Sequence, residues 1–354
     1  MIIAIAFFSL ITLIIIHELG HFLLAKKFGI RVEEFGIGLP PRLFGKKIGE
    51  TIYSINLLPL GGFVKLYGHE KRETDPDSFS SKPIWQRALV ILGGVVSFWI
   101  VAAVLLSIVM ALGVPTVVGD EETGLTDPKV QIVSVSKDSP AEQTEIRIGD
   151  AIRGINNVSV SKVKEVQEIT EVNKGKEMTL TIQRGKEVFD VSLVPRESFP
   201  AGDGAMGVGL MRIALKSYPW YLAPFKGIIA TGNLTLAILD GWVMILSSLF
   251  QGNGMPQGVE VSGIVGIFEL FVLVGGLGLS YFLQFIAIIA VSLALINALP
   301  IPALDGGWLA FLFLEKIRGK PVKQKTEQVI SSVFFILLIA LMIWINVRDI
   351  IRIF

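Results

Sequence analysis

The 354-residue chain contains no cysteine, which excludes disulfide bonds and thiolate metal sites. Only three histidines are present, so a zinc or iron ion would need these residues together with Asp or Glu. Charged residues make up 18% of the chain and the net charge is +1. Low charge with high hydrophobicity excludes a disordered chain and a coiled coil, and the balance of signs excludes a basic nucleic-acid-binding protein.

Hydrophobic residues are abundant instead, at 52% of the chain with a mean hydropathy of +0.64. Four apolar stretches approach the roughly 20 residues that cross a bilayer: 1–25, 88–113, one that ends near residue 299, and 329–346. The first has no preceding basic segment and no small-residue cleavage site, so we expect a retained span rather than a signal peptide. The composition therefore predicts a polytopic α-helical membrane protein with four transmembrane helices.

Lysine and arginine cluster in 26–87 and again in 315–325. Because short cytoplasmic loops carry the excess of basic residues, both segments are expected in the cytoplasm. Both termini and residues 115–270 would then lie on the periplasmic or extracellular side. We expect the inner membrane of a bacterium as the location.

Two further apolar segments complicate this count. Residues 225–250 are apolar enough to span, but Lys226, Asn233 and Asp240 interrupt them. A fifth span would also place the basic segment 315–325 outside, so we interpret 225–250 as an interfacial amphipathic helix. The glycine-rich residues 263–278 are expected to form a bend or surface segment before the third span.

Residues 117–197 have a different character, with alternating apolar residues separated by Gly, Asp and Asn turns. Strands are predicted at Val130–Val135, Met178–Ile182 and Val188–Val194, and a helix at Lys162–Val172. The stretch from Ile146 to Asn157, with a Gly-Asp turn leading into a strand, resembles the core signature of PDZ domains. An ordinary small α+β domain is the alternative. A PDZ domain would bind a peptide or protein ligand by strand addition rather than carry out chemistry.

The first apolar stretch contains the motif His17-Glu18-Leu-Gly-His21. Two histidines four residues apart lie on one helical face, so both imidazoles could bind one zinc, and Glu18 could take a proton from bound water. The alternative is a chance group of polar residues at a helix end. Ionisable groups inside a bilayer are costly, which favours the functional interpretation. His69 lacks such a context and is expected to be an exposed loop residue.

Zinc in a catalytic site needs a third protein ligand. The candidate is Asp305, in the segment Asn297-Ala-Leu-Pro-Ile-Pro-Ala-Leu-Asp-Gly-Gly307 at the end of the third span. With four spans, the first and third run in the same direction. The C-terminal ends of both would then reach the same depth near the cytoplasmic side, so one Zn²⁺ per chain could be held there.

These features together resemble the site-2 protease family of intramembrane zinc metalloproteases, in particular the bacterial regulator of sigma-E protease group. The resemblance implies that His17, His21 and Asp305 bind zinc and that Glu18 activates water. It further implies that Asn297 holds the substrate or the developing oxyanion. The segment Leu60–Lys65, after a predicted strand at Thr51–Asn56, is similar to the membrane-associated β-loop of that family. Substrate-binding residues are expected there, at Ile52, Asn56, Gly61, Gly62 and Phe63.

Four regions follow from this interpretation: 1–114 with the first two spans and the β-loop, 115–214 as the PDZ domain, 215–270 as the interfacial region, and 271–354 with the last two spans. The expected reaction is peptide-bond hydrolysis within transmembrane segments of single-span proteins that have already been trimmed, such as anti-sigma factors or signal-peptide remnants. Expected partners are these substrates, a ligand at the PDZ domain and the lipid bilayer, without nucleic acid. Two alternatives stay open: a metal transporter that uses the same three ligands, and a catalytically silent PDZ scaffold.

Overall fold

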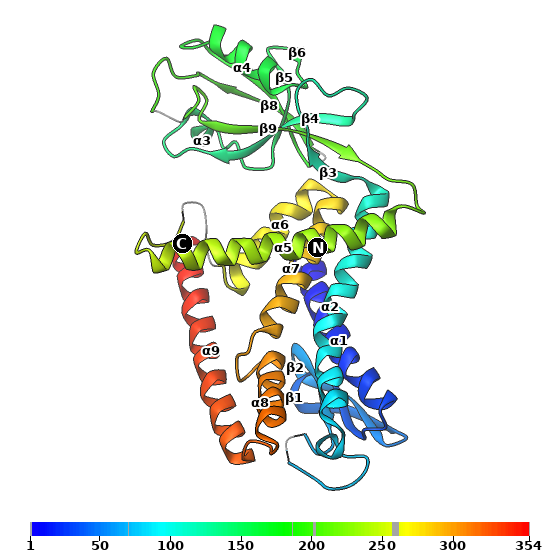
Figure 1. Cartoon of the computed structure of the whole chain (residues 1–354). Helices are drawn as coiled ribbons and strands as arrows, with labels where there is room; N and C mark the ends of the chain where they lie inside the picture. Colours follow the sequence, from blue (N-terminus) through cyan, green and yellow to red (C-terminus); the bar gives the residue numbers. More distant parts are fainter. Residues whose placement is uncertain (1, 70, 186, 201–202, 257–261, 354) are drawn as a thin grey trace. The chain divides into compact units, whose positions relative to one another are not determined.

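The computed structural model of the chain describes residues 2–69, 71–185, 187–200, 203–256 and 262–353 (Figure 1). These residues form two compact units. The first unit comprises residues 1–106, 227–269 and 286–354, and the second comprises 107–226 and 270–285. The first unit holds most of the long helices and the second holds most of the strands.

Among the described residues, five helices are long and apolar enough to cross a membrane. They are α1 (Ile2–Lys27), α2 (Ile84–Leu112), α5 (Ala223–Phe250), α7 (Leu279–Ala298) and α9 (Gln324–Ile353). The shorter helices α6 (Ile264–Leu277) and α8 (Asp305–Arg318) complete this set. The four predicted spans correspond to α1, α2, α7 and α9. The helix α5 also meets the criterion of length and composition, so the chain has one more candidate span than the sequence predicts.

The helix α5 differs from α9 in its direction, since it runs across α9 rather than along it (Figure 1). Burial does not set it apart: 6% of its most apolar window is buried inside the protein, and 0% of that of α9. Among its contacts with α2, Nε1 of Trp99 donates a hydrogen bond to Oγ1 of Thr235 at 3.2 Å.

The prediction of a bend or surface segment at 263–278 is wrong for most of its length, because residues 264–277 form the helix α6. The bend is confined to Gly278, which has a φ of 125° and separates α6 from α7. Apolar residues throughout α6 favour a packed helix over a surface loop. At its N-terminus, Asp349 of α9 accepts hydrogen bonds from the backbone N–H groups of Gly263 and Gly266 at 2.7 and 3.2 Å.

The helices α1 and α2 cross at a glycine contact. A Cβ atom built on Gly20 would lie 2.2 Å from the carbonyl oxygen of Gly93, which is too close for any side chain. Small residues at such a crossing let two helix backbones approach closely, a common way of packing helices in membranes. This close approach brings one face of α2 against the face of α1 that carries the histidines.

Two long strands, β1 (Val32–Ile48) and β2 (Thr51–Leu66), follow α1 and form the first sheet. Both strands bend back on themselves, so residues 32–37 lie between two parts of β2, namely 51–56 and 62–66. Residues 42–48 pair with the other side of 51–56. Residues 62–66 therefore form one edge of this sheet among the described residues, and 51–56 lie in its interior.

A buried cluster joins this sheet to the helices. Its apolar side chains come from α1, β1, β2, the turn before α2, α2 itself and α8: Ala25, Ile30, Val32, Leu66, Phe79, Val90, Ile91 and Leu312. Burying a side chain of this size contributes about 1.5–3 kcal/mol. The cluster fixes the C-terminal end of β2 next to α2 and α8, which matters for the site described below.

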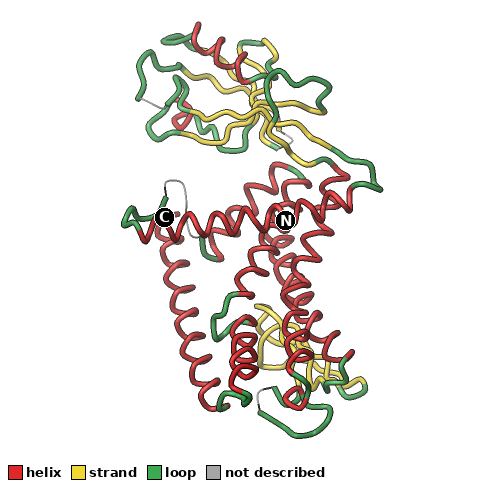
Figure 2. Tube along the Cα trace, in the orientation of Figure 1, coloured by secondary structure: helices red, strands yellow, loops and turns green. Residues whose placement is uncertain are grey.

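The second unit contains the β-rich domain, residues 114–216, whose strands are yellow in Figure 2. They run in the order β3-β9-β4-β5-β7-β8, with β6 paired to β5. Its elements are β3 (Val114–Val117), β4 (Thr126–Val135), α3 (Pro140–Gln143), β5 (Ala151–Ile155), β6 (Val158–Ser159), α4 (Val163–Val172), β7 (Met178–Arg184), β8 (Glu187–Leu193) and β9 (Val208–Lys216). The predicted helix coincides with α4, and the three predicted strands fall on β4, β7 and β8. The period-two pattern of this region therefore located its strands correctly.

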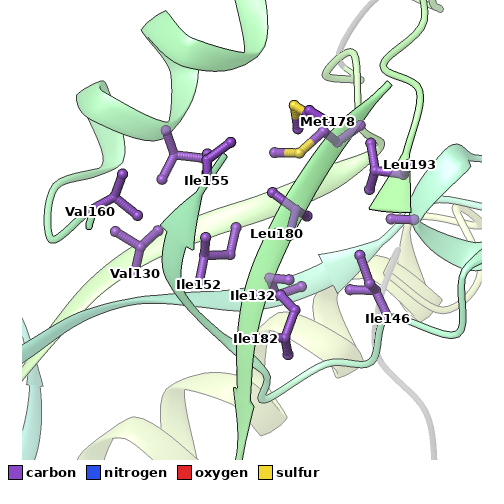
Figure 3. Packing of buried hydrophobic residues seen from close by; sticks show 13 residues of the cluster. Val130, Ile132, Ile146, Ile152, Ile155, Val160, Met178, Leu180, Ile182 and Leu193 are labelled. Carbon is purple, nitrogen blue, oxygen red and sulfur yellow. The ribbon is translucent and has the colours of Figure 1, made fainter. Parts of the chain in front are cut away.

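Branched side chains from β4, β5 and β7 form the core of the β-rich domain (Figure 3). Ile132, Ile152, Ile155, Leu180 and Ile182 are all 0% exposed. In β7 they alternate with more exposed residues, as expected for a strand with one buried face, whereas in β4 and β5 one neighbour of each is buried too. The domain therefore has a hydrophobic core of its own.

The Gly149-Asp150 turn is tied to this core by a buried carboxylate. Gly149 has a φ of 96°, a conformation that glycine adopts without strain. The side chain of Asp150 is 1% exposed and forms two hydrogen bonds of 2.7 Å with the guanidinium of Arg184. It also accepts the backbone N–H of Arg147 at 2.9 Å. The turn is thus held by side-chain bonds as well as by the sheet.

Asp150→Ala is expected to destabilise the β-rich domain by about 2–3 kcal/mol, because it removes charge-assisted hydrogen bonds from a buried site. Arg184 is partly exposed and can be rehydrated, which keeps the loss below that for a fully buried pair. Hydrogen exchange of β4, β5 and β7 amides in the full-length protein measures the change. Asp190→Ala, at an exposed position of β8, is the control, and equal protection in both variants would contradict the expectation.

Candidate metal centre

Three side chains from two helices converge in the first unit. His17 and His21 lie one turn apart on α1 and are each 8% exposed, and Asp305 is the first residue of α8. The Nε2 atoms of the histidines are 3.3 Å apart. Oδ2 of Asp305 lies 3.3 Å from Nε2 of His17 and 3.4 Å from Nε2 of His21. The three atoms form a nearly equilateral triangle.

The dimensions of this triangle fit a tetrahedral metal. Zinc binds nitrogen and oxygen at about 2.0–2.1 Å, which places neighbouring ligand atoms of a tetrahedron about 3.3–3.4 Å apart. Oδ2 of Asp305 is buried and has no hydrogen-bond partner among the described residues. A buried carboxylate oxygen facing two imidazole nitrogens is the arrangement that a cation would satisfy. His17, His21 and Asp305 could therefore hold one metal ion.

The helix α2 supplies the surroundings of both imidazoles. Nδ1 of His21 lies 2.9 Å from the backbone carbonyl oxygen of Val90, so this nitrogen can carry the proton and leave Nε2 for a metal. The ring of His17 stacks on the ring of Phe98, with centroids 4.7 Å apart and an interplanar angle of 18°. Between these two contacts, Gly94 faces both histidines. Its added Cβ would lie 2.3 Å from Nε2 of His21.

Sequence reasoning missed these α2 residues. Val90, Gly94 and Phe98 follow one another at intervals of four, so they share one helical face. The Gly93-Gly94 pair inside an apolar span was the available signal, since paired glycines mark a place where another backbone approaches closely. That signal indicates a helix crossing, but it does not tell which helix crosses or that histidines lie there.

Two glycines place Asp305. A Cβ on Gly306 would lie 2.1 Å from the carbonyl oxygen of Leu299, and one on Gly307 would lie 2.3 Å from that of Ile301. The chain that leaves α7 therefore folds tightly over the first turn of α8. The Asp-Gly-Gly sequence thus brings the carboxylate back toward α1 through a turn that only glycine permits at these positions.

A cavity of about 140 Å³ lies beside two of the three candidate ligands, His21 and Asp305. Glu18, His21 and Asp305 line it, together with Val64 of β2, His69 and Trp308. One water needs about 10–15 Å³, so the cavity has room for a larger group such as a peptide bond. Glu18 points to the side of α1 that faces β2, where a Cβ on Gly62 would lie 3.4 Å from its Cγ. The arrangement places a carboxylate and a candidate metal site around one space.

The prediction that His69 is an exposed loop residue is wrong. Its ring packs between Phe79 and Trp308, with centroid distances of 4.8 and 4.3 Å. Burial of the imidazole lowers its pKa to about 4, so the ring is neutral near pH 7. The reason for the difference is the turn after β2, which carries His69 inward to the cavity.

Asn297 lies near the end of α7, where its Nδ2 donates a hydrogen bond to the carbonyl oxygen of Leu293 at 2.9 Å. This contact is within its own helix. Asn297 is not among the residues that line the cavity next to Glu18. Its expected role toward the substrate stays a prediction.

The five expected substrate-binding residues have different surroundings. Ile52 and Asn56 belong to the inner part of the sheet, and the buried amide of Asn56 donates to the carbonyl oxygen of Gly38 at 3.1 Å. Gly61, Gly62 and Phe63 begin the edge segment of β2. Gly62 pairs with Ile37 and Phe63 with Gly36.

Comparison with known proteins agrees with this geometry. The profile of peptidase family M50 matches residues 5–341, which is almost the whole chain. The chain belongs to peptidase family M50. It is therefore a multi-pass membrane zinc metalloprotease, and the zinc expected from the sequence is confirmed as the cofactor of the family.

Relatives resemble the chain over nearly their full length. A Clostridium acetobutylicum protein classed by name among the zinc metalloproteases is 34% identical over 349 residues, covering 99% of this chain and 97% of its own. The regulator of sigma-W protease RasP of Bacillus subtilis is 26% identical over 433 residues, covering 97% and 96%. The zinc metalloprotease RasP of Oceanobacillus iheyensis is 28% identical and covers 97% of both chains.

Among solved structures, the PDZ domain of an SdrC-like protein from Listeria monocytogenes is similar to part of the M50 protein. The match covers 25% of this chain and 92% of that domain, with a TM-score of 0.22 and 20% sequence identity.

Gly94→Ala is expected to lower the affinity of this M50 protein for zinc at least about 10-fold, because the new methyl group would displace an imidazole. The metal content of the purified protein and a competitive zinc titration measure the change. Gly241→Ala on α5 is the control, since a Cβ there meets nothing within 4 Å. Equal zinc affinity in both variants would show that the close approach of α2 to the histidines is not needed.

Proposed function

We propose that this M50 protease hydrolyses peptide bonds within the transmembrane segments of single-span membrane proteins that have already been shortened on their far side. One observation carries the proposal. His17, Glu18 and His21 lie within α1, a helix of span length and composition, and Asp305 meets them there. A hydrolytic site at that depth can act on peptide bonds that a soluble protease does not reach.

His17, His21 and Asp305 would hold the zinc, which when bound polarises the substrate carbonyl and lowers the pKa of a bound water. Glu18 accepts the proton of the attacking water as the new carbon–oxygen bond forms. The same carboxyl group then gives this proton to the leaving amine as the carbon–nitrogen bond breaks. Val90 holds the ring of His21 through its backbone carbonyl, and Phe98 holds that of His17.

A transmembrane substrate helix must unwind before its peptide bonds can be attacked, because each is protected by its own hydrogen bonds. The edge of β2 at residues 62–66 supports strand addition as the way to hold the unwound segment. Within this edge, Gly62 lies next to Glu18, and Val64 and Leu66 line the cavity. Ile52 and Asn56 would instead keep the sheet in shape from its interior.

Four spans rather than five suit the geometry of the site. The C-terminal half of α1 and the end of α7 meet at Asp305, so both helices reach the same depth. This requires an even number of crossings between the end of α1 and the end of α7. The helices α2 and α7 satisfy this requirement when α5 lies along the interface, and the direction of α5 across α9 supports that placement.

The four-span topology puts the site and residues 26–87 and 306–323 on the cytoplasmic side of a bacterial inner membrane. The β-rich domain and both termini would face the periplasm or exterior. A PDZ-like domain at that position could bind a peptide and, with α5, exclude substrates whose far-side portion is still large. Cleavage would then release the cytoplasmic part of the substrate.

Glu18→Gln is expected to keep zinc and to lose cleavage by about 100-fold to 10,000-fold, because the amide cannot accept the proton of water. The assay is cleavage of a tagged single-span reporter, shortened on its far side, by the purified protein in detergent, with and without a zinc chelator. Mass spectrometry of the products locates the cut bond.

Cleavage within the span by the zinc-loaded wild type alone supports the proposal. Equal cleavage by Glu18→Gln would remove Glu18 from the mechanism. Zinc binding without cleavage of any of several reporters would favour the scaffold, and zinc flux in proteoliposomes would favour the transporter.

The absence of cysteine makes the topology directly testable by labelling single introduced cysteines in intact and permeabilised cells. Four spans predict that Lys71→Cys and Lys320→Cys react only after permeabilisation, whereas Glu121→Cys in the β-rich domain reacts in intact cells. All three positions are exposed. Labelling of Lys320→Cys in intact cells would mean that α5 crosses the membrane.

A further inference from the structure

The cavity beside the candidate metal centre contains one polar side chain that the proposed mechanism does not use. His69 lines it together with Glu18 and Asp305, from a segment outside α1 and α8. Its Nε2 atom is buried and has no hydrogen-bond partner among the described residues. Buried polar nitrogens are nearly always paired, so an unpaired one beside a reaction cavity points to a partner that arrives with the substrate.

Backbone hydrogen bonds and a glycine turn position His69. Strand β2 ends at Leu66, and Gly68 then adopts a φ of 75°. A Cβ at Gly68 would lie 2.1 Å from Oγ of Ser78, so the turn requires glycine. The backbone N–H of His69 donates to the carbonyl oxygen of Leu66 at 3.2 Å, and that of Phe79 donates to the carbonyl oxygen of Tyr67 at 2.8 Å.

The rings on either side of the imidazole restrict it further. Phe79 contacts it edge-on at an interplanar angle of 80°, and Trp308 lies against its other side at 46°. Trp308 follows Asp305 by three residues on α8, so the same helical turn positions a candidate ligand and a wall of the histidine pocket. A side chain confined in this way is pre-organised, which is the condition for an effective hydrogen-bond donor in a reaction.

Hydrolysis of an amide passes through a tetrahedral intermediate, in which negative charge develops on the former carbonyl oxygen. A donor aimed at that oxygen stabilises the transition state more than the ground state. Asn297 donates its amide to Leu293 within α7 and does not line the cavity. The neutral imidazole of His69 does line it.

We propose that His69 is a further catalytic residue, whose Nε2–H donates a hydrogen bond to the carbonyl oxygen of the peptide bond under attack. The inference rests on the proposed proteolytic function. Water adds to the carbonyl carbon, its proton passes to Glu18, and the electron pair of the carbonyl moves to the oxygen that faces His69. The carbon–nitrogen bond then breaks and Glu18 returns the proton to the amine. His69 keeps its own proton throughout.

The test compares His69→Phe, which keeps a planar ring without a donor, with His69→Gln, which keeps a donor. The full chain is loaded with zinc in detergent. Its affinity is measured for a peptide phosphonamidate, whose tetrahedral anionic phosphoryl group imitates the intermediate. Affinity for the parent peptide is measured in the Glu18→Gln background, where the peptide is not cut. His69→Phe is expected to lower kcat and phosphonamidate affinity about 100-fold, with KM and parent-peptide affinity nearly constant. His69→Gln should recover part of the loss.

Two controls separate this role from a structural one. The zinc content of His69→Phe must equal that of the wild type. Phe79→Leu, which alters packing on one side of the ring and keeps the imidazole, should change both affinities by similar small factors. If His69→Phe folds poorly, His69→Gln and His69→Leu are compared instead, and the donor-free leucine variant should show the larger loss.

The proposal would be overturned if His69→Phe bound the phosphonamidate as tightly as the wild type does. An equal loss of affinity for the phosphonamidate and the parent peptide would also overturn it, since that pattern indicates general distortion. Asn297→Leu is measured in parallel, and a selective loss in that variant alone would assign the oxyanion contact to Asn297. Failure of the wild type to cut any reporter would contradict the proposed function, whereas selective phosphonamidate binding would still decide the role of His69.

Discussion

The close approach of α2 to α1 is the constraint on which the site depends. Gly20 and Gly93 let the two backbones meet, and Gly94 then places a peptide backbone against both imidazoles. That backbone offers a carbonyl acceptor to His21, and the next turn of α2 offers the ring of Phe98 to His17. The two Nε2 atoms are left facing Asp305 at the spacing of a tetrahedron. A methyl group at the crossing would disturb all of these contacts together.

Charge explains why such a site can exist within a span. Two neutral imidazoles, the Asp305 carboxylate, the Glu18 carboxylate and a divalent cation sum to a formal charge of zero. Burying a net charge in a low-dielectric region is far more costly than burying a compensated group. Besides their proposed roles in ligation and proton transfer, Asp305 and Glu18 would therefore both offset the charge of the metal. The same balance accounts for the unpaired Oδ2 of Asp305, which a cation would satisfy.

The three candidate ligands could be predicted from the sequence because they follow simple geometric rules. Histidines four residues apart share a helical face, and the ends of two helices that run the same way share a depth. The surroundings obey no such local rule. Which helix packs on the histidines depends on a crossing between segments about seventy residues apart. The position of His69 depends on one left-handed glycine and its contact with Ser78, neither of which has a periodic signature.

Secondary structure, too, could be predicted where a local pattern exists and less well where it does not. Alternating patterns located the strands of the β-rich domain, since one buried face imposes a period of two. For α6 and α5 the sequence was less decisive. Glycines in 263–278 favoured a bend, although residues 264–277 form a helix and only Gly263 and Gly278 lie outside it. Length and composition make α5 a candidate span, and its place at the interface is argued from its direction and from the geometry of the site.

One continuous segment, residues 61–69, connects the handling of substrate to the chemistry. Its first part forms the edge of the sheet beside Glu18, and its last residue lines the same cavity as Glu18. Between them, Leu66 packs in the core shared by α2 and α8. The same buried residue therefore positions both the substrate-binding edge and His69. A substrate strand added to this edge would be held in register with the imidazole of His69 by the backbone of one strand. Binding an extended substrate and placing a donor on its carbonyl would then be consequences of the same short stretch of chain.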